Sequence, residues 1–524
     1  MLMDGPVLKF RSPWREVSDS GSALAGIFKR RPLVEFWSCL LAGGLLSLVD
    51  RTDANWDLQN YHLYAPFALL HGRLALDYFA AGFQAYLNPV ADIPYFLTKC
   101  VIFPDAPRVV AFCAGLPFGL LAYFLLKLAR LLTGGGWVAV LAALIGITAA
   151  TTLSEVGTSF GDILVADLIL PALFLLLARR GRAPVIAGAL AGLAVALKLT
   201  AAIYGPPMVL LLVISTGGWK ARLRAVASFG LAAGVFFALG YAPWAWLLWQ
   251  RFHDPVFPLL GGVFHSPWAP AINPRDVRFL PKTALQWIAY PFYWIEGRSF
   301  VVGEEPIRDP RFALAYVALM TVVAGAAGLV PWRQRRPSPA LVAFWWFFAT
   351  SYVTWLILFS ILRYALPLEV CTGIVVVSVL RHYFDERDTR RASLALLVLC
   401  LVVTQSVGWG RIGYDKTLLA RPLPRLPRHA FVFVSGVPLG FAEVPLARPD
   451  SRFVDLQLAL ANAAERQVVS SVLAAGAPAR LLTNREPTAS AGVLSRFGLV
   501  LDACMRMPSA VQRRIELCRL RRAH

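Results

Sequence analysis

Long apolar blocks separated by short basic segments run through residues 33–410 of the chain. A membrane-spanning helix needs about 20 consecutive, mostly apolar residues. Eleven blocks come near or reach that length: 33–49, 107–126, 137–153, 161–178, 183–199, 200–215, 225–249, 311–330, 340–358, 364–380 and 392–410. The pattern predicts an all-α polytopic membrane protein with about eleven transmembrane helices.

The basic residues predict the orientation of these helices. They gather in the loops on one side, 127–136, 179–183, 216–224, 331–338 and 381–391, whereas the opposite loop 154–160 has none. By the positive-inside rule, the basic side is cytoplasmic. The basic N-terminal segment 1–32 is then cytoplasmic, and the first block is an uncleaved anchor. An odd number of spans places the C-terminus on the outer side.

Composition supports a membrane protein and argues against another class. The chain is 57% hydrophobic and 16% charged, whereas a soluble chain carries about a quarter charged residues. A net charge of +20 would suggest a nucleic-acid partner in a soluble protein. Here the bases lie mainly in short loops, so the expected partner is the lipid bilayer and not nucleic acid. Usage rich in Ala, Leu, Arg and Pro suggests a bacterial inner membrane with a periplasmic C-terminus.

Three segments on the outer side are long enough to hold a site: 50–106, 250–310 and 411–524. In the first, Tyr64–Leu70 and Ile93–Phe103 are predicted helices that lie on the membrane surface. In the tail, Phe431–Val434 and Ala479–Leu482 are predicted strands and Leu456–Ala475 is a predicted helix. The chain therefore divides into the cytoplasmic segment 1–32, a transmembrane domain 33–410, and a small α/β periplasmic domain 411–524.

Two cysteines of the tail differ from the other five, which fall in or beside apolar blocks. Cys504 and Cys518 lie in polar sequence. They could form a disulfide if the tail is periplasmic, because that compartment is oxidising.

The stretch Asp50–His62, just after the first block, interleaves acids and amides with aromatic residues. A solvated loop that ends a helix is the alternative, but such loops rarely combine these side chains, and conspicuous loop residues often carry function. The pattern favours a carboxylate that accepts a proton from a nucleophile. Asp53 and Asp57 are the candidate bases, and Tyr61 and His62 beside them are candidate substrate-binding residues.

This stretch resembles the GT-C superfamily of lipid-sugar-dependent glycosyltransferases, whose members carry an acidic residue in the first outer loop. In aminoarabinose transferases and protein O-mannosyltransferases it opens an Asp-x-x-x-Tyr motif, which Asp57 and Tyr61 match. The resemblance implies a GT-C-like membrane domain, a polyprenyl-phosphate sugar donor and Asp57 as the catalytic base. Leu58 stands where these relatives have a second acidic residue, and Asp53 competes with Asp57.

Asp162 opens the fourth block, at the end of the second outer loop. It is a candidate helix N-cap or a second site carboxylate facing Asp57. In some members of the superfamily such a pair helps to hold a divalent metal. The sequence shows no specific metal-ligand spacing, so it assigns no metal and leaves a divalent ion open.

Two bases lie on the outer side, where the positive-inside bias does not account for them. Lys198 stands between two blocks, and Arg363 precedes Tyr364 before a late block. Snorkelling to the headgroups is the alternative, but ionisable residues beside spans are usually functional. Arg363 and Tyr364 also resemble a recurring GT-C feature, which implies binding of the carrier phosphate. In segment 250–310, His265 and Arg278 are weaker candidates for substrate binding, because the aromatic residues there also suit an interfacial belt.

The resulting hypothesis is an integral-membrane glycosyltransferase that moves a sugar from a polyprenyl-phosphate donor to a periplasmic glycan, lipid or protein. A single displacement would invert the anomeric centre. The alternatives are a flippase or transporter for a lipid-linked sugar and a ligase acting on a lipid-diphosphate glycan. A transporter should show polar residues at mid-bilayer depth, and the predicted spans hold few. The chain has no P-loop and no dinucleotide fingerprint.

Overall fold

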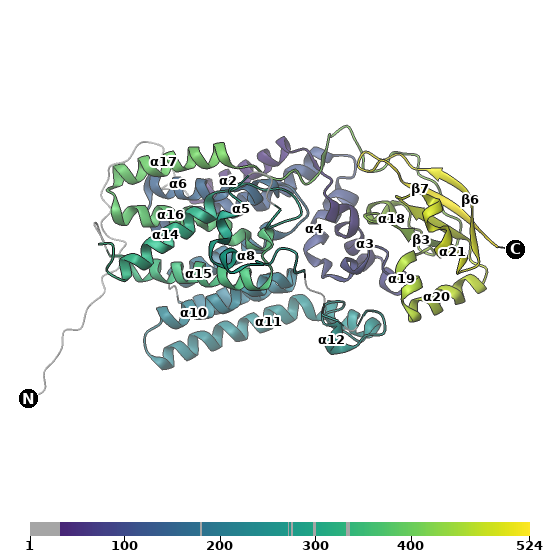
Figure 1. Ribbon diagram of the computed structural model, residues 1–524, viewed down its shortest axis with the longest axis horizontal. Helices are drawn as coiled ribbons and strands as arrows, with labels where there is room; N and C mark the ends of the chain where they lie inside the picture. Colours follow the sequence, from purple (N-terminus) through teal and green to yellow (C-terminus); the bar gives the residue numbers. More distant parts are fainter. Residues whose placement is uncertain are drawn as a thin grey trace, which may run out of the picture.

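The computed structural model describes residues 32–178, 181–270, 272–273, 276–296, 300–331 and 336–523. The N-terminal segment 1–31 lies outside these ranges, as do four bases of the loops expected to be cytoplasmic: Arg179, Arg180, Arg333 and Arg335. Figure 1 shows a helical part at one end of the molecule and a sheet domain at the other, with α3 and α4 between them.

Each of the eleven predicted blocks contains an apolar helix. They are α2 (Pro32–Val49), α5 (Pro107–Thr133), α6 (Gly136–Ile147), α8 (Asp162–Ala178), α9 (Ala183–Leu197), α10 (Gly205–Ser215), α11 (Trp219–Phe252), α14 (Arg311–Ala326), α15 (Pro339–Leu358), α16 (Leu366–Tyr383) and α17 (Glu386–Val403). Within the described ranges, five helical stretches are long and apolar enough to cross a membrane: Pro32–Val49, Pro107–Thr133, Trp219–Phe252, Pro339–Leu358 and Leu362–Tyr383. The chain is a multi-pass membrane protein, while eleven crossings stay a prediction.

Small residues allow some of these helices to pack closely. A Cβ atom on Gly43 of α2 would lie 2.5 Å from the carbonyl oxygen of Gly115 in α5. Such close backbone approach is typical of helix packing in membranes, where van der Waals contact replaces the hydrophobic effect between helices.

Block 137–153 is not one helix, contrary to the prediction. It ends as α6 at Ile147, and a short helix α7 (Ala150–Ser154) follows. The buried Arg311 side chain donates to the carbonyl oxygens of Ile145 and Thr148 at 2.6 and 2.9 Å. The Asp309 carboxylate accepts from the Ala150 N–H at 2.8 Å. These bonds satisfy the backbone groups that the break leaves open.

The N-terminus of α7 is held by a carboxylate from a distant helix. Glu369 of α16 accepts from the N–H groups of Thr151 and Thr152 at 3.1 and 2.9 Å. Because α7 precedes the second outer loop, this contact fixes where that loop begins.

Block 200–215 also departs from the prediction, since it opens as the 3₁₀ turn η6 (Leu199–Tyr204) before α10. Pro206 and Pro207 stand at the start of α10, where proline is tolerated because the N–H it lacks has no helical partner there.

The first outer segment is built of short helical turns. They are η1 (Leu58–His62), α3 (Tyr64–Leu70), η2 (Arg73–Ala75), η3 (Phe83–Tyr86), η4 (Pro89–Asp92), α4 (Ile93–Phe96) and η5 (Leu97–Ile102). Tyr64–Leu70 is helical as predicted, whereas Ile93–Phe103 divides into α4 and the π turn η5. Segment 250–310 holds α12 (Gly261–Phe264), α13 (Ala284–Ala289) and η7 (Tyr290–Phe292).

The tail forms a domain around a five-stranded mixed sheet of order β4-β3-β5-β7-β6. Its elements are β3 (Phe431–Ser435), α18 (Gly440–Leu446), β4 (Arg452–Asp455), α19 (Leu456–Ala461), α20 (Ala463–Ala474), β5 (Ala479–Thr483), η9 (Pro487–Ser490), α21 (Ala491–Ser495), β6 (Leu499–Arg506) and β7 (Glu516–Arg522). The strands β4, β3 and β5 run parallel, while β7 is antiparallel to its neighbours β5 and β6.

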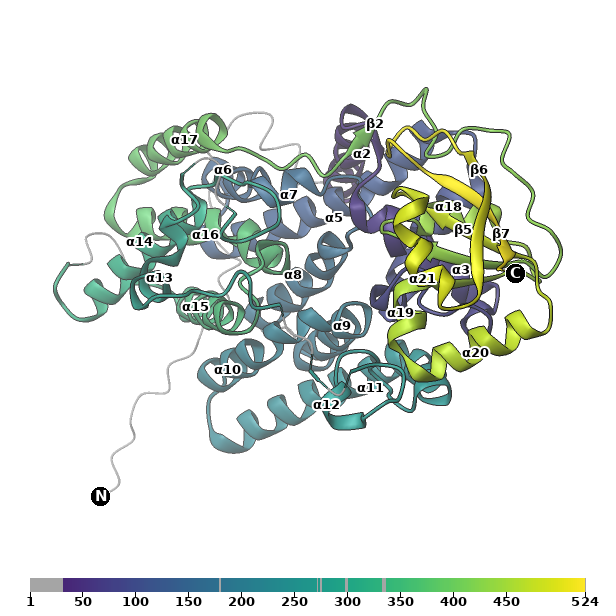
Figure 2. The same cartoon turned by 45° about the vertical axis from the view of Figure 1, so that its right-hand side comes forward.

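The predicted helix Leu456–Ala475 is two helices, because the Asn462 side chain accepts from the Glu465 N–H at 3.1 Å and caps α20. Strands β6 and β7 carry Cys504 and Cys518, whose sulfur atoms are bonded at 2.01 Å. Figure 2 shows these two strands on the side of the domain away from α6 and α14.

Buried polar contacts fix the domain to the first outer segment. Arg73 pairs with Asp77 at 2.6 Å and donates to the Arg448 and Ser451 carbonyl oxygens. Tyr78 bonds the backbone of β4, since its N–H donates to the Phe453 carbonyl at 2.9 Å. The segment therefore extends the sheet by one bridged residue, and the C-terminal domain cannot turn freely above the membrane part.

Candidate active site

A short two-stranded sheet brings together the ends of the membrane part. Strand β1 (Thr52–Asp53) follows α2 and pairs antiparallel with β2 (Arg411–Ile412), which follows α17. Asp53 is buried, and its carboxylate accepts from the Asn55 side chain at 2.9 Å and from the Ser159 N–H at 2.9 Å. Both oxygens of Asp53 are thus engaged, and Oδ2 joins the first outer loop to the second through Ser159.

Asp57 lies at the start of the π turn η1 and faces a base that is 306 positions away in the sequence. Its Oδ2 atom is 3.3 Å from Nη1 of Arg363, in the 3₁₀ turn η8 (Leu362–Ala365). Both side chains keep a small exposed fraction, 16% for Asp57 and 15% for Arg363. Of the two candidate bases, Asp57 is therefore the one that a substrate can reach.

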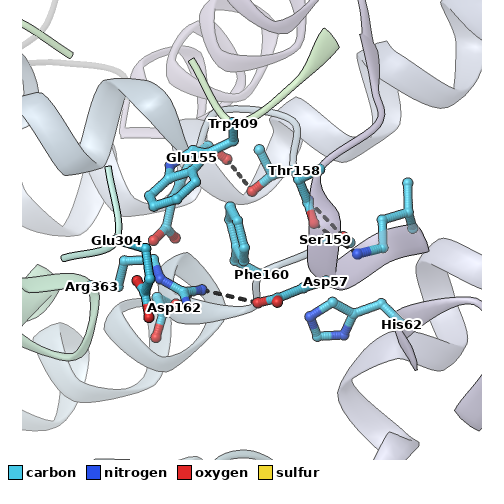
Figure 3. Close-up of polar contacts among 12 residues, drawn as sticks. Asp57, His62, Glu155, Thr158, Ser159, Phe160, Asp162, Glu304, Arg363 and Trp409 are labelled. Carbon is cyan, nitrogen blue, oxygen red and sulfur yellow. Dashed lines mark hydrogen bonds and ion pairs between the residues drawn. The ribbon is translucent and has the colours of Figure 1, made fainter. Parts of the chain in front are cut away.

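The Arg363 guanidinium is held by two rings and a second carboxylate. It lies 4.3 Å from the centroid of the Phe160 ring and 5.5 Å from that of Trp409. Its Nη1 atom is also 3.9 Å from Oδ2 of Asp162. Figure 3 shows Arg363 between Asp162 and Asp57, with Phe160 above it. A planar cation stacked on aromatic faces suits recognition of an anion such as phosphate.

Lys198 completes the group as the partner of Asp162. Its Nζ atom lies 2.6 Å from Oδ1 of Asp162 and donates to the Phe160 carbonyl oxygen at 3.2 Å. The same ammonium group is 5.3 Å from the centroid of the Tyr364 ring. Two acids and two bases from four separate outer segments thus alternate across a few ångströms.

His62 and Tyr61 lie beside Asp57. The Nδ1 atom of His62 is 2.7 Å from Oδ1 of Asp92, and its ring centroid is 4.2 Å from that of Tyr61. Burial lowers the pKa of His62, but the charge of Asp92 and the hydrogen bond to it outweigh that effect and raise the pKa above its ordinary value.

Two residues of this group were not among the sequence candidates, Asp92 and Glu155. Asp92 has no motif around it, and only the fold brings it to His62. Glu155 follows α7 and is 1% exposed, and neither of its carboxylate oxygens has a hydrogen-bond partner among the described residues. Burial and the nearby charge of Asp162 raise its pKa well above the ordinary value. In the sequence, only the position of Glu155 in the second outer loop, close to Asp162, could have identified it as a site residue.

The two remaining candidates lie apart from this group. His265 is exposed at the end of α12, and Pro267 beside it accepts from Asn462 of the C-terminal domain. Arg278 has a 64% exposed side chain that pairs with Asp276 and Glu304. Glu304 lines a cavity of about 20 Å³ together with Arg363, so Arg278 reaches the margin of the site only through this carboxylate.

An apolar cavity of about 150 Å³ adjoins the group of charged residues. Its walls come from α4, α5, the second outer loop and α8, and Asp92, Glu155 and Thr158 are among the polar residues that line it. One or two isoprene units are of this size and polarity.

The donor set at the charged group does not resemble a metal site. Asp57 and Asp162 each pair with a base. Among the described residues, one cluster has metal-ligand spacing, and it contains Cys504 and Cys518, which share a disulfide.

The sequence profile of glycosyltransferase family 87 matches residues 93–360, just over half of the chain. The chain belongs to glycosyltransferase family 87. This membership makes the protein a membrane glycosyltransferase and confirms the enzyme class expected from the first outer loop. The matched range includes Asp162 and Lys198 but ends before Arg363.

The fold of this family 87 member is similar to that of a solved structure, the crystal structure of ArnT from Cupriavidus metallidurans bound to undecaprenyl phosphate. The similarity has a TM-score of 0.52 at 15% sequence identity, and it covers 93% of this chain and 97% of that chain. The likeness confirms the ArnT-like, GT-C arrangement of the membrane part with its C-terminal mixed-sheet domain. A comparison with curated protein sequences gave no match.

Proposed function

We propose that this family 87 enzyme transfers a sugar from a polyprenyl-phosphate donor to a hydroxyl group at the outer surface of the membrane. The observation that carries the proposal is the Arg363 guanidinium shared by Asp57 and Asp162, with Lys198 on the far side of Asp162. The likeness to ArnT supports the donor class, since that protein is bound to undecaprenyl phosphate.

Asp57 is the proposed catalytic base. A carboxylate can take the proton of an attacking hydroxyl when it lies within hydrogen-bond reach. Asp57 retains exposed surface, whereas Oδ1 of Asp53 accepts from Asn55 and Oδ2 accepts from Asn55 and Ser159. Asp53 therefore has the structural role of joining the two outer loops.

Arg363 and Lys198 are the proposed ligands of the carrier phosphate. Each base pairs with a carboxylate, so neither charge is buried without a partner. A phosphate would replace part of these contacts and would place its leaving oxygen against two preorganised cations. Such cations stabilise the negative charge that develops as the bond to the sugar breaks.

The reaction is a single displacement. The acceptor oxygen forms a bond to the anomeric carbon, its proton goes to Asp57, and the bond from that carbon to the phosphate oxygen breaks with its electron pair. One displacement inverts the anomeric centre, as in inverting glycosidases. The apolar cavity of about 150 Å³ beside Asp92 suits the first isoprene units of the carrier.

The proposed setting is a bacterial inner membrane, with residues 1–32 cytoplasmic and residues 411–524 forming a periplasmic domain. The basic loops support this orientation. The disulfide between Cys504 and Cys518 also suits an oxidising compartment. The domain is held against the first outer segment by hydrogen bonds from Arg73 to the carbonyl oxygens of Arg448 and Ser451, so it can help to bind the acceptor glycan, lipid or protein.

The test uses purified protein in nanodiscs and a panel of radiolabelled polyprenyl-phosphate sugars. Release of free polyprenyl phosphate is followed with and without a cell-envelope extract as acceptor, and empty nanodiscs are the control. Release that needs both the protein and the extract is expected for one donor of the panel. No release with any donor would contradict the proposed donor class.

A further inference from the structure

The π turn η1 places His62 on the same side of the chain as Asp57. In an α-helix, residues five apart point about 140° away from each other. A π turn closes its hydrogen bonds between residues five apart, so the fifth residue returns nearly above the first. Asp57 precedes the turn and His62 ends it. Turns of this kind inside helices often occur at functional sites.

The His62 ring is fixed so that one nitrogen remains available. Nδ1 lies 2.7 Å from the Asp92 carboxylate, which can only accept, so Nδ1 carries the hydrogen. In the neutral ring, Nε2 then holds a lone pair. Nε2 is buried and has no hydrogen-bond partner among the described residues. Figure 3 shows Asp57 between Arg363 on one side and the His62 ring on the other.

The charged groups around His62 are few. Asp92 and Asp57 favour its protonated form, Lys198 opposes it, and the Tyr61 ring packs on its face. The balance raises the pKa of His62 above its ordinary value, although burial lowers it. An imidazole held by a carboxylate in this way is a stronger proton acceptor, as in the serine protease triad.

We infer that His62, oriented by Asp92, takes from Asp57 the proton that Asp57 removes from the acceptor hydroxyl. This inference rests on the proposed function. The transfer breaks the O–H bond of the protonated Asp57 carboxyl and forms an N–H bond at Nε2 of His62. The Asp57 carboxylate is restored for the next turnover, and the positive charge of the imidazolium is balanced by Asp92. His62 and Asp92 act through Asp57 and are positioning residues.

The test is the pH dependence of sugar transfer for His62→Gln, Asp92→Asn and the unmodified protein, in nanodiscs with the donor that supports transfer. His62→Gln should lower kcat about 100-fold and leave the KM for the donor within about threefold. Because Asp92 raises the pKa of His62, Asp92→Asn should move the acidic limb of the rate profile about one unit to lower pH. Asp105→Asn, at an exposed position of the same outer segment, is the matched control and should change neither.

The outcomes separate this inference from the proposed function. No transfer by the unmodified protein with any donor would overturn both. Transfer by the unmodified protein, together with a uniform loss at every pH in Asp92→Asn, would show a merely structural role and would overturn the inference alone. Thermal unfolding of each variant identifies a folding failure. If His62→Gln fails to fold, Asp92→Asn alone tests the inference: a shift of the acidic limb to lower pH supports it, and an unshifted limb overturns it.

Discussion

Replacement of Arg363 by Gln tests the electrostatic centre of the site. The guanidinium is within 4 Å of both Asp57 and Asp162 and lies over two aromatic rings. Gln keeps some hydrogen-bonding capacity but removes the charge. The change should therefore weaken stabilisation of the leaving phosphate while the backbone of the turn η8 stays in place.

The expected loss follows from the distances. With an effective dielectric constant of about 20, unit charges 3.3 Å apart attract by about 5 kcal/mol. The net contribution is smaller, because the phosphate must replace Asp57 and Asp162 as partners. One preorganised group facing a developing negative charge is worth about 3–4 kcal/mol. Arg363→Gln should lower kcat/KM by about 100- to 1,000-fold. Arg363→Lys keeps the charge but loses the planar contact with Phe160 and Trp409, so it should cost about tenfold.

The assay is release of polyprenyl phosphate in nanodiscs at saturating acceptor, with donor varied. Arg496→Gln, at an exposed position of the C-terminal domain, is the control for loss of an arginine. Transfer by a folded Arg363→Gln protein within threefold of the unmodified rate would refute a role for this residue at the phosphate.

Three further predictions concern stability. Burial raises the folded-state pKa of Glu155 well above its unfolded value. The contribution of Glu155 to folding stability is therefore present below about pH 4.3 and is lost as pH rises through the folded-state pKa. At pH 8, Glu155→Gln should unfold at a higher temperature than the unmodified protein, and an equal or lower unfolding temperature would contradict this reasoning. Cys504→Ser removes a disulfide bridge that spans 14 positions and should destabilise the C-terminal domain by about 3 kcal/mol in denaturant titrations. Reduction of the disulfide in the unmodified protein should produce the same loss. Arg73→Met leaves Asp77 buried without its charged partner and should lower the folding stability by about 3–5 kcal/mol. The loss should appear as faster proteolysis of residues 413–430. Unchanged proteolysis would show that other contacts hold the domain.

The apolar helices could be predicted because each element is encoded locally. A block of apolar residues must form its hydrogen bonds within itself in a membrane, and α2, α8 and α9 lie within a few residues of the predicted blocks. The breaks were not predictable in the same way. The end of α6 depends on Arg311, which lies more than 160 positions from the carbonyl groups that it satisfies.

The candidate site was predictable in its residue types but not in its pairs. Asp57, Asp162, Lys198 and Arg363 stood out because charged residues beside outer ends of spans are uncommon. Their alternation depends on contacts such as Asp57 with Arg363, which are 306 positions apart. The resemblance implied Asp57 as the base, with Asp53 as a competing candidate, and the bonds from Asn55 and Ser159 that occupy Asp53 support the choice of Asp57.

The C-terminal domain was the least predictable part. Strands β3 and β5 are short, mostly buried and mostly apolar runs and were expected. Strand β6 is interrupted by Asp502 and ends at Arg506, and β7 alternates its apolar residues with Arg519 and Arg521, so neither is a comparable run. Their pairing depends on β5 and on the bridge between Cys504 and Cys518.

The most direct test of the mechanism is sugar transfer by Asp57→Asn, with donor binding measured on the same preparation. Asn has the size of Asp but cannot accept the proton. The mechanism predicts a fall in kcat of at least about 100-fold, with donor affinity within a few-fold of the unmodified protein because Arg363 and Lys198 remain. Transfer by Asp57→Asn at a rate within threefold of the unmodified protein would show that another group is the base.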